Sequence, residues 1–254
     1  MESAHTHEIY PLFAMSRYVV KEIRHLVGKG IHTREMLRDG DHVLVAVSGG
    51  KDSLSLLWLL RERIKRVPIQ YRVTAAHVDP GFGADSAGQM ETFFTEHGFE
   101  HRIIRGDMGP RAHGPENREN PCFLCSRLRR KVLFETASLL GCNKIAFGHH
   151  KDDMIETFFL NILYGGSIST MMPVQEFFEG RISVIRPMYM ADEDIIARYA
   201  RIMNFPEIDL GCPTSGSSRR EEVRKMLKHF YRTNRKIKGN IFHALHNVRP
   251  EYLL

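Results

Sequence analysis

Six consecutive residues, Ser48, Gly49, Gly50, Lys51, Asp52 and Ser53, combine the groups that a phosphate-binding turn requires. Two adjacent glycines allow a tight turn without a Cβ and bring backbone amides close to a ligand. Lys51 adds a full positive charge and a following helix would add a partial one, so the turn suits phosphate. The spacing is not that of the longer Walker-type loop, because only Ser48 precedes the glycine pair. The alternative is a glycine turn that merely joins two elements.

Regular elements must surround this turn. An apolar, β-branched run at 43–47 predicts a buried strand, and leucines at helical spacing over 54–60 predict the helix that follows. Further strands are predicted at 71–78, 100–105 and 144–147, with helical patterns between them. This alternation predicts an α/β fold, an open and mainly parallel sheet of about five strands with helices on both faces.

Ligands of such sheets bind beyond the carboxyl ends of the strands. The residues expected near a nucleotide for this reason are Ala76, His77, Val78, Gly148 and His149. His77 has the alternative of a packed strand residue. Asp152 and Asp153 come at the start of a predicted helix, where a carboxylate could bind magnesium or accept a proton; an N-cap is the alternative for Asp152.

Cys122 and Cys125 stand at the predicted start of a helix, after a breaker-rich loop at 106–121. The helix field and the neighbouring arginines favour thiolates at this position. A zinc or iron–sulfur ligand pair, a disulfide or persulfide relay, and two incidental cysteines are all compatible with the spacing. Cys142 is expected to be a buried core residue.

Composition and charge narrow the class of protein. With 254 residues and 43% hydrophobic content the chain can form a core without disulfides. We expect no secretory signal, no membrane span and a cytoplasmic location, where paired cysteines favour metal or redox chemistry. The net charge of +6 is concentrated at 127–131 and 219–238, which favours a polyanion as partner or, alternatively, reflects solvated helix faces.

Three motifs in this order resemble one family. The Ser48–Ser53 turn resembles the pyrophosphate loop of the PP-loop ATP pyrophosphatase superfamily, whose members adenylate an acceptor oxygen. Together with Cys122–Arg130 and Gly148–Asp153, it resembles the tRNA 2-thiolation enzymes of that superfamily, and most closely those that form 2-thiocytidine. Asp39–Asp41, and Ile185 to Pro187, also look like that family, so the resemblance runs from about residue 15 to near the C-terminus.

The resemblance implies roles for particular residues. ATP and Mg²⁺ would occupy the turn, with Lys51 catalytic and Asp52 a magnesium ligand. The family's 4Fe–4S cluster implies Cys122, Cys125 and Cys212 as its ligands, although a second Cys-x-x-Cys is usual in the last region and position 215 here is serine. Asp153, and less directly Asp152, matches the catalytic acidic position, and Arg129 matches a basic position near the cluster.

The resemblance also implies partners. These are tRNA and a cysteine desulfurase or another sulfur donor, and a homodimer is compatible with the sequence. We expect a helical segment at 1–40, an ATP-binding domain at 41–190 and a basic helical flank at 191–254. The tRNA-binding residues predicted on that flank are Arg219, Arg220, Arg224 and Lys228.

The predicted function is ATP-dependent replacement of a pyrimidine C2 oxygen of tRNA by sulfur. One alternative is an amidase or lysidine-type ligase of the same superfamily, with zinc-binding or incidental cysteines. The other is a non-enzymatic module that binds RNA or carries sulfur.

Overall fold

The computed structural model describes residues 6–83, 85–214 and 218–252, and the chain divides into two compact units. The first comprises residues 1–150 and 173–213, and the second comprises residues 151–172 and 214–254. These boundaries differ from the predicted ones at 40/41 and 190/191. The long N-terminal helix packs within the first unit, and the helix that begins at Lys151 groups with the C-terminal helices.

A six-stranded sheet in the order β3-β2-β1-β4-β6-β5 forms the centre of the first unit. All neighbouring pairs are parallel except β5–β6. The strands are β1 (His42–Ala46), β2 (Arg72–Asp79), β3 (His101–Arg105), β4 (Lys144–Ala146), β5 (Val174–Phe177) and β6 (Ile182–Ile185). The predicted α/β class is confirmed. The sheet has six strands where the sequence predicts about five, because the β5–β6 hairpin has no helix between its strands and departs from the alternation.

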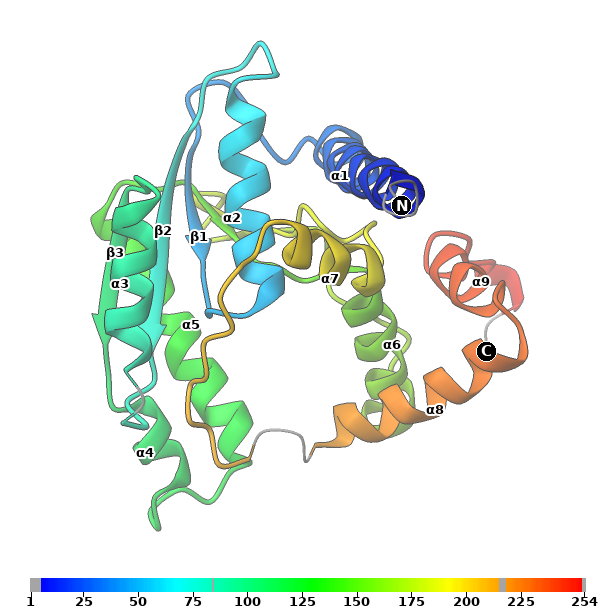
Figure 1. The fold of residues 1–254 in the computed structure, drawn as a ribbon. Helices are drawn as coiled ribbons and strands as arrows, with labels where there is room; N and C mark the ends of the chain where they lie inside the picture. The colour runs from blue at the N-terminus through cyan, green and yellow to red at the C-terminus, as the bar shows by residue number, and fades with distance from the viewer. Residues whose placement is uncertain (1–5, 84, 215–217, 253–254) are drawn as a thin grey trace. The chain divides into compact units, whose positions relative to one another are not determined.

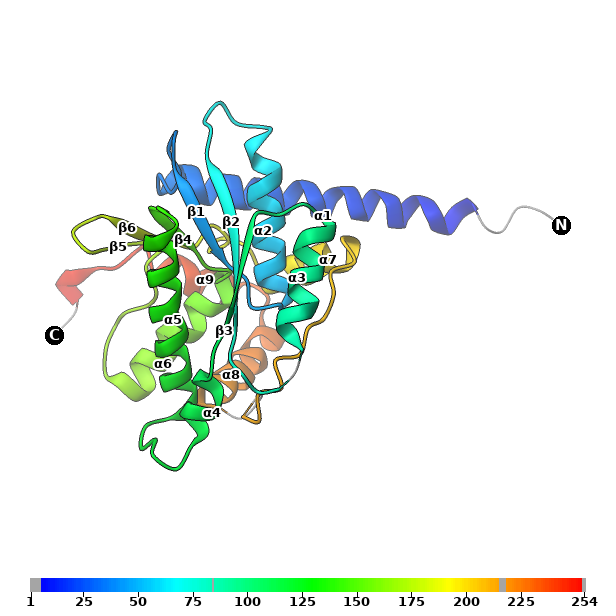
Figure 2. The same ribbon diagram turned by 90° about the vertical axis from the view of Figure 1, so that its left-hand side faces the viewer.

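Helices cover both faces of this sheet (Figures 1 and 2). In Figure 2, α2 and α3 lie on one side of the strands and α5 on the other. The helices of the unit are α1 (Thr6–Thr33), α2 (Lys51–Ile64), α3 (Ser86–Glu96), α4 (Met108–His113), α5 (Pro121–Leu139) and α7 (Glu193–Ile202). One buried apolar cluster joins β1, β2, β4 and β6 to α5 through Leu44, Ala76, Ile145, Val184 and Leu133. The predicted structureless loop at 106–121 is wrong in part, because α4 forms within it.

The strand order locates the ligand site. From β1 the chain proceeds to β2 and then β3 in one direction, and later elements extend the sheet from β1 through β4 in the other. The connections that follow β1 and β4 therefore diverge. At such a point a crevice lies beyond the carboxyl ends of the two strands. The 48–53 turn follows β1 and Gly148 follows β4, so the topology brings both motifs to this point.

Gly28 and Gly30 lie inside α1, although glycines often end a helix. The helix continues to Thr33, and a turn follows it. A Cβ on Gly30 would lie 3.0 Å from the carbonyl oxygen of Pro187 and 3.1 Å from the ring of Tyr189. A glycine costs about 1 kcal/mol in a helix interior. Because Gly30 has no side chain, α1 can approach the 187–189 segment closely.

The Gly30→Ala variant is therefore expected to lower the stability of the protein. The added methyl group would contact backbone and a fully buried tyrosine, which can move little. The destabilisation from overpacking, about 1–3 kcal/mol, should therefore exceed the stabilisation from the higher helix propensity of alanine, about 1 kcal/mol. Urea unfolding of the variant measures the difference. Gly239→Ala is the matched control, since no neighbouring atom lies within 4 Å of its added Cβ and α9 (Ile237–Ala244) should gain stability. A Gly30→Ala protein at least as stable as the parent would contradict this account.

The second unit is helical. It contains α6 (Lys151–Gly165), α8 (Arg219–Thr233), α9 and a short 3-10 helix (Pro250–Tyr252). Ile155 of α6 packs with Val223 and Leu227 of α8 in a small buried cluster, and Phe242 of α9 lies against it. This cluster explains why α6 belongs with the C-terminal helices. None of the helices in the described ranges is long and apolar enough to cross a bilayer.

Candidate functional site

The 48–53 turn is folded around the hydroxyl of Ser53. This hydroxyl donates to the Gly50 carbonyl at 2.9 Å and accepts from the Ser48 amide at 3.1 Å. Gly49 has a φ of +89°, which a residue with a side chain rarely adopts, and Gly50 is the N-cap of α2. Gly50 has no side chain that could cap the first amides of α2, so those amides suit an anion. The strand, turn and helix predicted from the sequence are present in that order.

The ammonium of Lys51 lies between two carboxylates. Its Nζ is 3.0 Å from Oε1 of Glu193, in the first turn of α7, and 3.3 Å from Oδ1 of Asp52. Burial alone would lower the pKa of Lys51, but the charge of Asp52 and the hydrogen bond and charge of Glu193 outweigh burial and raise it. Lys51 is therefore protonated at neutral pH. No sequence signal points to Glu193, because it lies 142 residues further along the chain and belongs to no motif.

His77 is completely buried at the end of β2. Its Nδ1 donates to the carbonyl of Val47 at 2.9 Å, and its Nε2 is 3.3 Å from the hydroxyl of Ser86. Burial is the main reason why the pKa of His77 is lowered, so the ring is neutral. Both ring nitrogens bond to protein groups, which favours a supporting role: His77 fixes the strand leading into the turn. Its neighbours Ala76 and Val78 are buried as well.

The segment after β4 approaches the turn closely. A Cβ on Gly148 would lie 3.1 Å from the backbone of Asp52 and Ser53. His150 follows in the same segment, and its Nε2 is 4.0 Å from Oδ2 of Asp52. His149 is half-buried beside the ring of Phe147. Gly148 thus belongs to the same crevice as the turn, as its position after β4 predicts.

Three of the four cysteines occupy one region of the first unit. Cys122 and Cys125 lie one turn apart at the start of α5, whose N-cap Asn120 accepts from the Phe123 amide. Cys212 lies in the segment after α7. The charges of both Cys122 and Cys212 act on the pKa of Cys125, and the charges of Cys125 and Cys212 act on that of Arg129. The fold therefore gathers the remote cysteine and Arg129 around the Cys-x-x-Cys. No disulfide joins the cysteines, all of which lie in described ranges.

The expectation of a ready thiolate is wrong for Cys125. Burial raises the pKa of its thiol, Arg129 opposes this, and the two neighbouring sulfurs raise the pKa further. Proximity of three thiols penalises their simultaneous ionisation unless a cation compensates for it. A bound metal supplies that cation and deprotonates its ligands.

The three sulfurs fit a soft metal group in chemistry. Thiolates are the ligands that iron–sulfur clusters and zinc prefer. Among the residues that the structure describes, no three histidine, cysteine or acidic side chains stand in an arrangement that could hold a single metal ion. In chemical type the three thiolates match the ligands of such a group, and Cys125 and Cys212 lie near enough to Arg129 for their charges to act on it.

The acidic pair at the start of α6 belongs to the second unit. Asp152 lies 2.6 Å from Nζ of Lys238, and Asp153 lies 3.2 Å from the guanidinium of Arg220. Because α6 begins at Lys151, Asp152 lies in the first turn and is not the N-cap. The carboxylates follow His150 after Lys151 in the chain, and both are paired with basic residues, Asp153 with Arg220 of α8 and Asp152 with Lys238 of α9.

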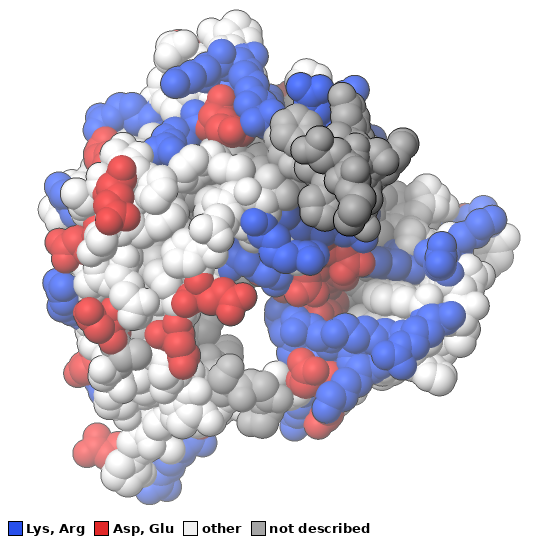
Figure 3. Space-filling model, viewed as in Figure 1, with Lys and Arg blue, Asp and Glu red and all other residues white. Residues whose placement is uncertain are grey.

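Two of the predicted RNA-binding residues have partners inside the second unit. Arg224 forms two hydrogen bonds to the buried carboxylate of Glu156, at 2.7 and 3.3 Å, and Arg220 binds Asp153. These contacts attach α8 to α6. Arg219 and Lys228 are exposed, as are Lys225 and Arg232 on the same helix. Figure 3 shows Lys and Arg side chains gathered along the segment labelled α8 in Figure 1.

The fold and the turn together define a class of protein. A parallel sheet with a glycine turn after β1, a lysine at the start of the next helix and a divergence of connections at this point is a nucleotide-binding α/β domain. A family profile described as PP-loop domain matches residues 15–228. The chain belongs to this PP-loop family.

Curated relatives and a solved structure are similar over most of the chain. A protein of Syntrophotalea carbinolica named tRNA-cytidine(32) 2-sulfurtransferase is 38% identical over 240 residues, covering 92% of each chain. A protein of the same name from Cupriavidus metallidurans is 41% identical and covers 91% of this chain and 74% of its own. The U34-tRNA thiolase NcsA from Methanococcus maripaludis, solved with its 4Fe–4S cluster, superposes with a TM-score of 0.76 at 25% identity. It covers 94% of this chain and 81% of its own.

Proposed function

We propose that this protein is an ATP-dependent tRNA 2-sulfurtransferase that converts the cytidine at position 32 to 2-thiocytidine. The observation that carries the proposal is the presence in one unit of a PP-loop and a group of three cysteines with Arg129. A ligase of the same superfamily needs the loop alone. The relatives named above support the substrate and the reaction.

The loop residues perform the first half of the reaction. The C2 oxygen of the cytidine bonds to the α-phosphorus of ATP, and the bond from that phosphorus to pyrophosphate breaks. Backbone amides of the turn and the ammonium of Lys51 stabilise the charge on the departing pyrophosphate. Glu193 and Asp52 hold Lys51 protonated and in place. We assign Ser48, Gly49, Gly50 and Ser53 to phosphate binding, and Gly148 and His149 to the nucleotide pocket.

Magnesium and three acidic residues also have roles in the proposal. Asp52 is the proposed ligand of the Mg²⁺ that accompanies ATP, and Asp153 and Asp152 are the proposed catalytic carboxylates. Because Asp153 and Asp152 are paired with Arg220 and Lys238, either would have to exchange that partner to bind a metal or a proton.

The cysteines perform the second half. A 4Fe–4S cluster held by Cys122, Cys125 and Cys212 would supply iron, which binds sulfur. Sulfur at the oxidation level of sulfide forms a bond to C2, and AMP leaves with the former C2 oxygen, so no electrons are exchanged. Arg129 compensates negative charge beside the thiolates. The sulfur comes from a cysteine desulfurase or another donor, and a cytoplasmic location, where tRNA is modified, is part of the proposal. A homodimer stays a prediction.

Mass spectrometry of tRNA nucleosides tests the function. Anaerobically purified protein is incubated with ATP, Mg²⁺, a sulfide source and tRNA that lacks thiolation. We expect 2-thiocytidine to appear only when ATP is present, with one pyrophosphate released for each sulfur inserted. Pyrophosphate release with tRNA but insertion of an amine in place of sulfur would favour the ligase alternative. Binding of tRNA without any pyrophosphate release would favour a non-enzymatic module.

The exposed side of α8 is proposed to bind tRNA through phosphates. Replacing Arg219, Lys225, Lys228 and Arg232 with alanine should reduce the slope of log affinity against log salt by roughly 0.7–0.9 for each lost contact. Titration of tRNA at several salt concentrations measures the slope. In the comparison variant Arg224→Ala, which strands the buried Glu156 carboxylate, we expect lower thermal stability and little change in slope. An unchanged slope in the fourfold variant would show that this side of α8 is only solvated.

A further inference from the structure

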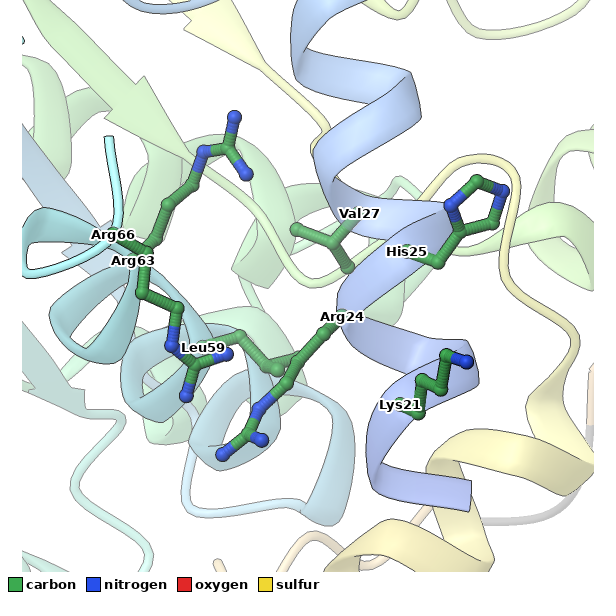
Figure 4. Close-up of a pocket in the computed structure, with 7 residues that line it drawn as sticks. All are labelled: Lys21, Arg24, His25, Val27, Leu59, Arg63 and Arg66. Atoms are coloured by element: carbon green, nitrogen blue, oxygen red, sulfur yellow. The ribbon is translucent and has the colours of Figure 1, made fainter. Parts of the chain in front are cut away.

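A second basic site lies in the first unit, at the end of α2 remote from the phosphate-binding turn. It is a cavity of about 360 Å³ between α1 and α2, lined by Lys21, Arg24, His25, Val27, Leu59, Arg63 and Arg66 (Figure 4). Arg63 is twelve residues beyond Lys51 in α2, which is about 18 Å along a helix axis. The cavity is therefore separate from the proposed ATP site.

The lining is strongly and unevenly charged. It contains four permanent cations and a histidine, and no acidic residue. Glu62, beside it, is already bound by Arg24 at 2.8 Å and by Arg66 at 3.3 Å. Within the described ranges, no acidic side chain pairs with Lys21 or Arg63. Cations held this close repel one another, so the site as a whole attracts an anion.

Arg63 in particular lacks an acceptor. Its Nε is buried and, among the described residues, has no hydrogen-bond partner. Buried donors in proteins are normally paired, so an unpaired guanidinium N–H at a cavity indicates a group that supplies the acceptor. Figure 4 shows Arg24 of α1 and Arg63 of α2 extending into the space between the two helices.

Gly28 makes room for this guanidinium. It lies inside α1, and a Cβ at this position would be 2.9 Å from Nη1 of Arg63. A glycine in a helix interior lowers helix stability, and here its lack of a side chain leaves space for the arginine at the wall of the cavity. Gly28 and Arg63 thus fit each other in shape. A chance gathering of surface charges would not need a glycine at this position.

We infer that this pocket binds a phosphodiester of the tRNA backbone. The inference depends on the proposed function, since it extends the tRNA contact to a second surface. Guanidinium groups bind phosphate oxygens in fixed geometry, and Lys21 adds a flexible charge. A free nucleotide fits less well, because the lining offers no phenylalanine, tyrosine or tryptophan ring on which a base could stack, and its one imidazole, that of His25, is exposed.

The variant Lys21→Ala/Arg63→Ala tests the pocket. Two lost phosphate contacts should weaken tRNA binding roughly 25- to 60-fold at 0.1 M salt, from a slope of about 0.7–0.9 per contact. ATP affinity should be unchanged, because the turn is at the other end of α2. The matched control is Arg102→Ala/Arg181→Ala, which removes two exposed cations elsewhere in the unit, outside the basic clusters at 127–131 and 219–238, and should leave tRNA affinity within about twofold.

Gly28→Ala separates position from net charge. Its added methyl displaces the Arg63 guanidinium without changing any charge, so tRNA affinity should still fall by about the effect of one contact, roughly five- to eightfold. Lys21→Glu, a change at an exposed position, serves if the double variant folds poorly, and it should weaken tRNA binding more than Lys21→Ala. Melting temperatures of all variants confirm that they are folded.

The outcomes distinguish this inference from the proposed function. If the parent protein thiolates tRNA and the double variant binds tRNA as tightly as the control, the pocket is not a tRNA contact, whereas the function stands. If the parent neither binds nor thiolates tRNA, the proposed function fails first. A third outcome is that inorganic phosphate stabilises the parent but not the double variant, while both bind tRNA with equal affinity. This outcome would overturn the RNA assignment and show that the pocket binds a small anion.

Discussion

Replacing any one of Cys122, Cys125 and Cys212 with alanine is expected to abolish tRNA thiolation and the broad visible absorption of the reconstituted protein. These three thiolates would hold the proposed 4Fe–4S cluster, and the loss of one would leave two, too few to retain it. In the structure the charges of Cys122 and Cys212 both act on Cys125, and those of Cys125 and Cys212 act on Arg129. Iron content, visible spectra and nucleoside mass spectrometry are measured on anaerobically reconstituted protein.

Cys142→Ala is the matched control for this series. Its thiol is 4% exposed, and burial raises its pKa to about 11, so it is a poor metal ligand. Iron content and thiolation should stay at the level of the parent. ATP affinity should survive all four substitutions, because the PP-loop contains no cysteine. Reconstituted protein that holds zinc and no iron, or a Cys212→Ala variant with full cluster content and activity, would refute the cluster assignment.

The sequence was most informative where a motif is local. The turn at 48–53, the strand before it and the helix after it depend on neighbours in the chain, and the glycine pair and leucine spacing predict all three. The parallel order of the strands follows from the alternation with helices. The hairpin of β5 and β6 was missed for the same reason, since its strands follow one another without a helix.

Long-range packing explains the remaining differences. Gly28 and Gly30 are helix-ending residues in most contexts, and only the contacts with Arg63, Pro187 and Tyr189 give them a place inside α1. The sequence likewise shows Arg220 and Arg224 as part of a basic run. Their acidic partners, more than 60 residues earlier in the chain, become visible only when α6 and α8 pack together.

Among the residues of the site, Cys212 is one that the sequence pattern alone does not identify as a ligand. The spacing between Cys125 and Cys212 matches no known metal-binding motif, and only the family resemblance predicts Cys212 as a cluster ligand. In the structure it reaches the Cys-x-x-Cys because the chain returns from α7 past the start of α5. Glu193, at the start of the same α7, reaches Lys51 and had no sequence signal.

Lys51→Ala is expected to lower the rate of tRNA-dependent pyrophosphate release by about 10²–10³, while the protein stays folded. The ammonium compensates charge that develops on the leaving pyrophosphate, and the loss of one such group in a preorganised site typically has this effect. Lys51 is well suited to the role, because Glu193 and Asp52 raise its pKa and fix its position. Pyrophosphate release and thermal melting are measured on the same preparations.

Two further variants serve as comparisons for Lys51→Ala. Lys65→Ala removes an equal charge from an exposed position just past the other end of α2, so its rate should match that of the parent. Glu193→Gln keeps a hydrogen-bond acceptor for Lys51 and removes one of the two charges that raise its pKa; Asp52 remains and Lys51 stays protonated at neutral pH, so the rate should fall less than in Lys51→Ala. A Lys51→Ala enzyme that releases pyrophosphate at the parent rate would remove this lysine from the mechanism, and a Glu193→Gln enzyme as slow as Lys51→Ala would show that a hydrogen-bond acceptor alone does not hold Lys51 in its working position.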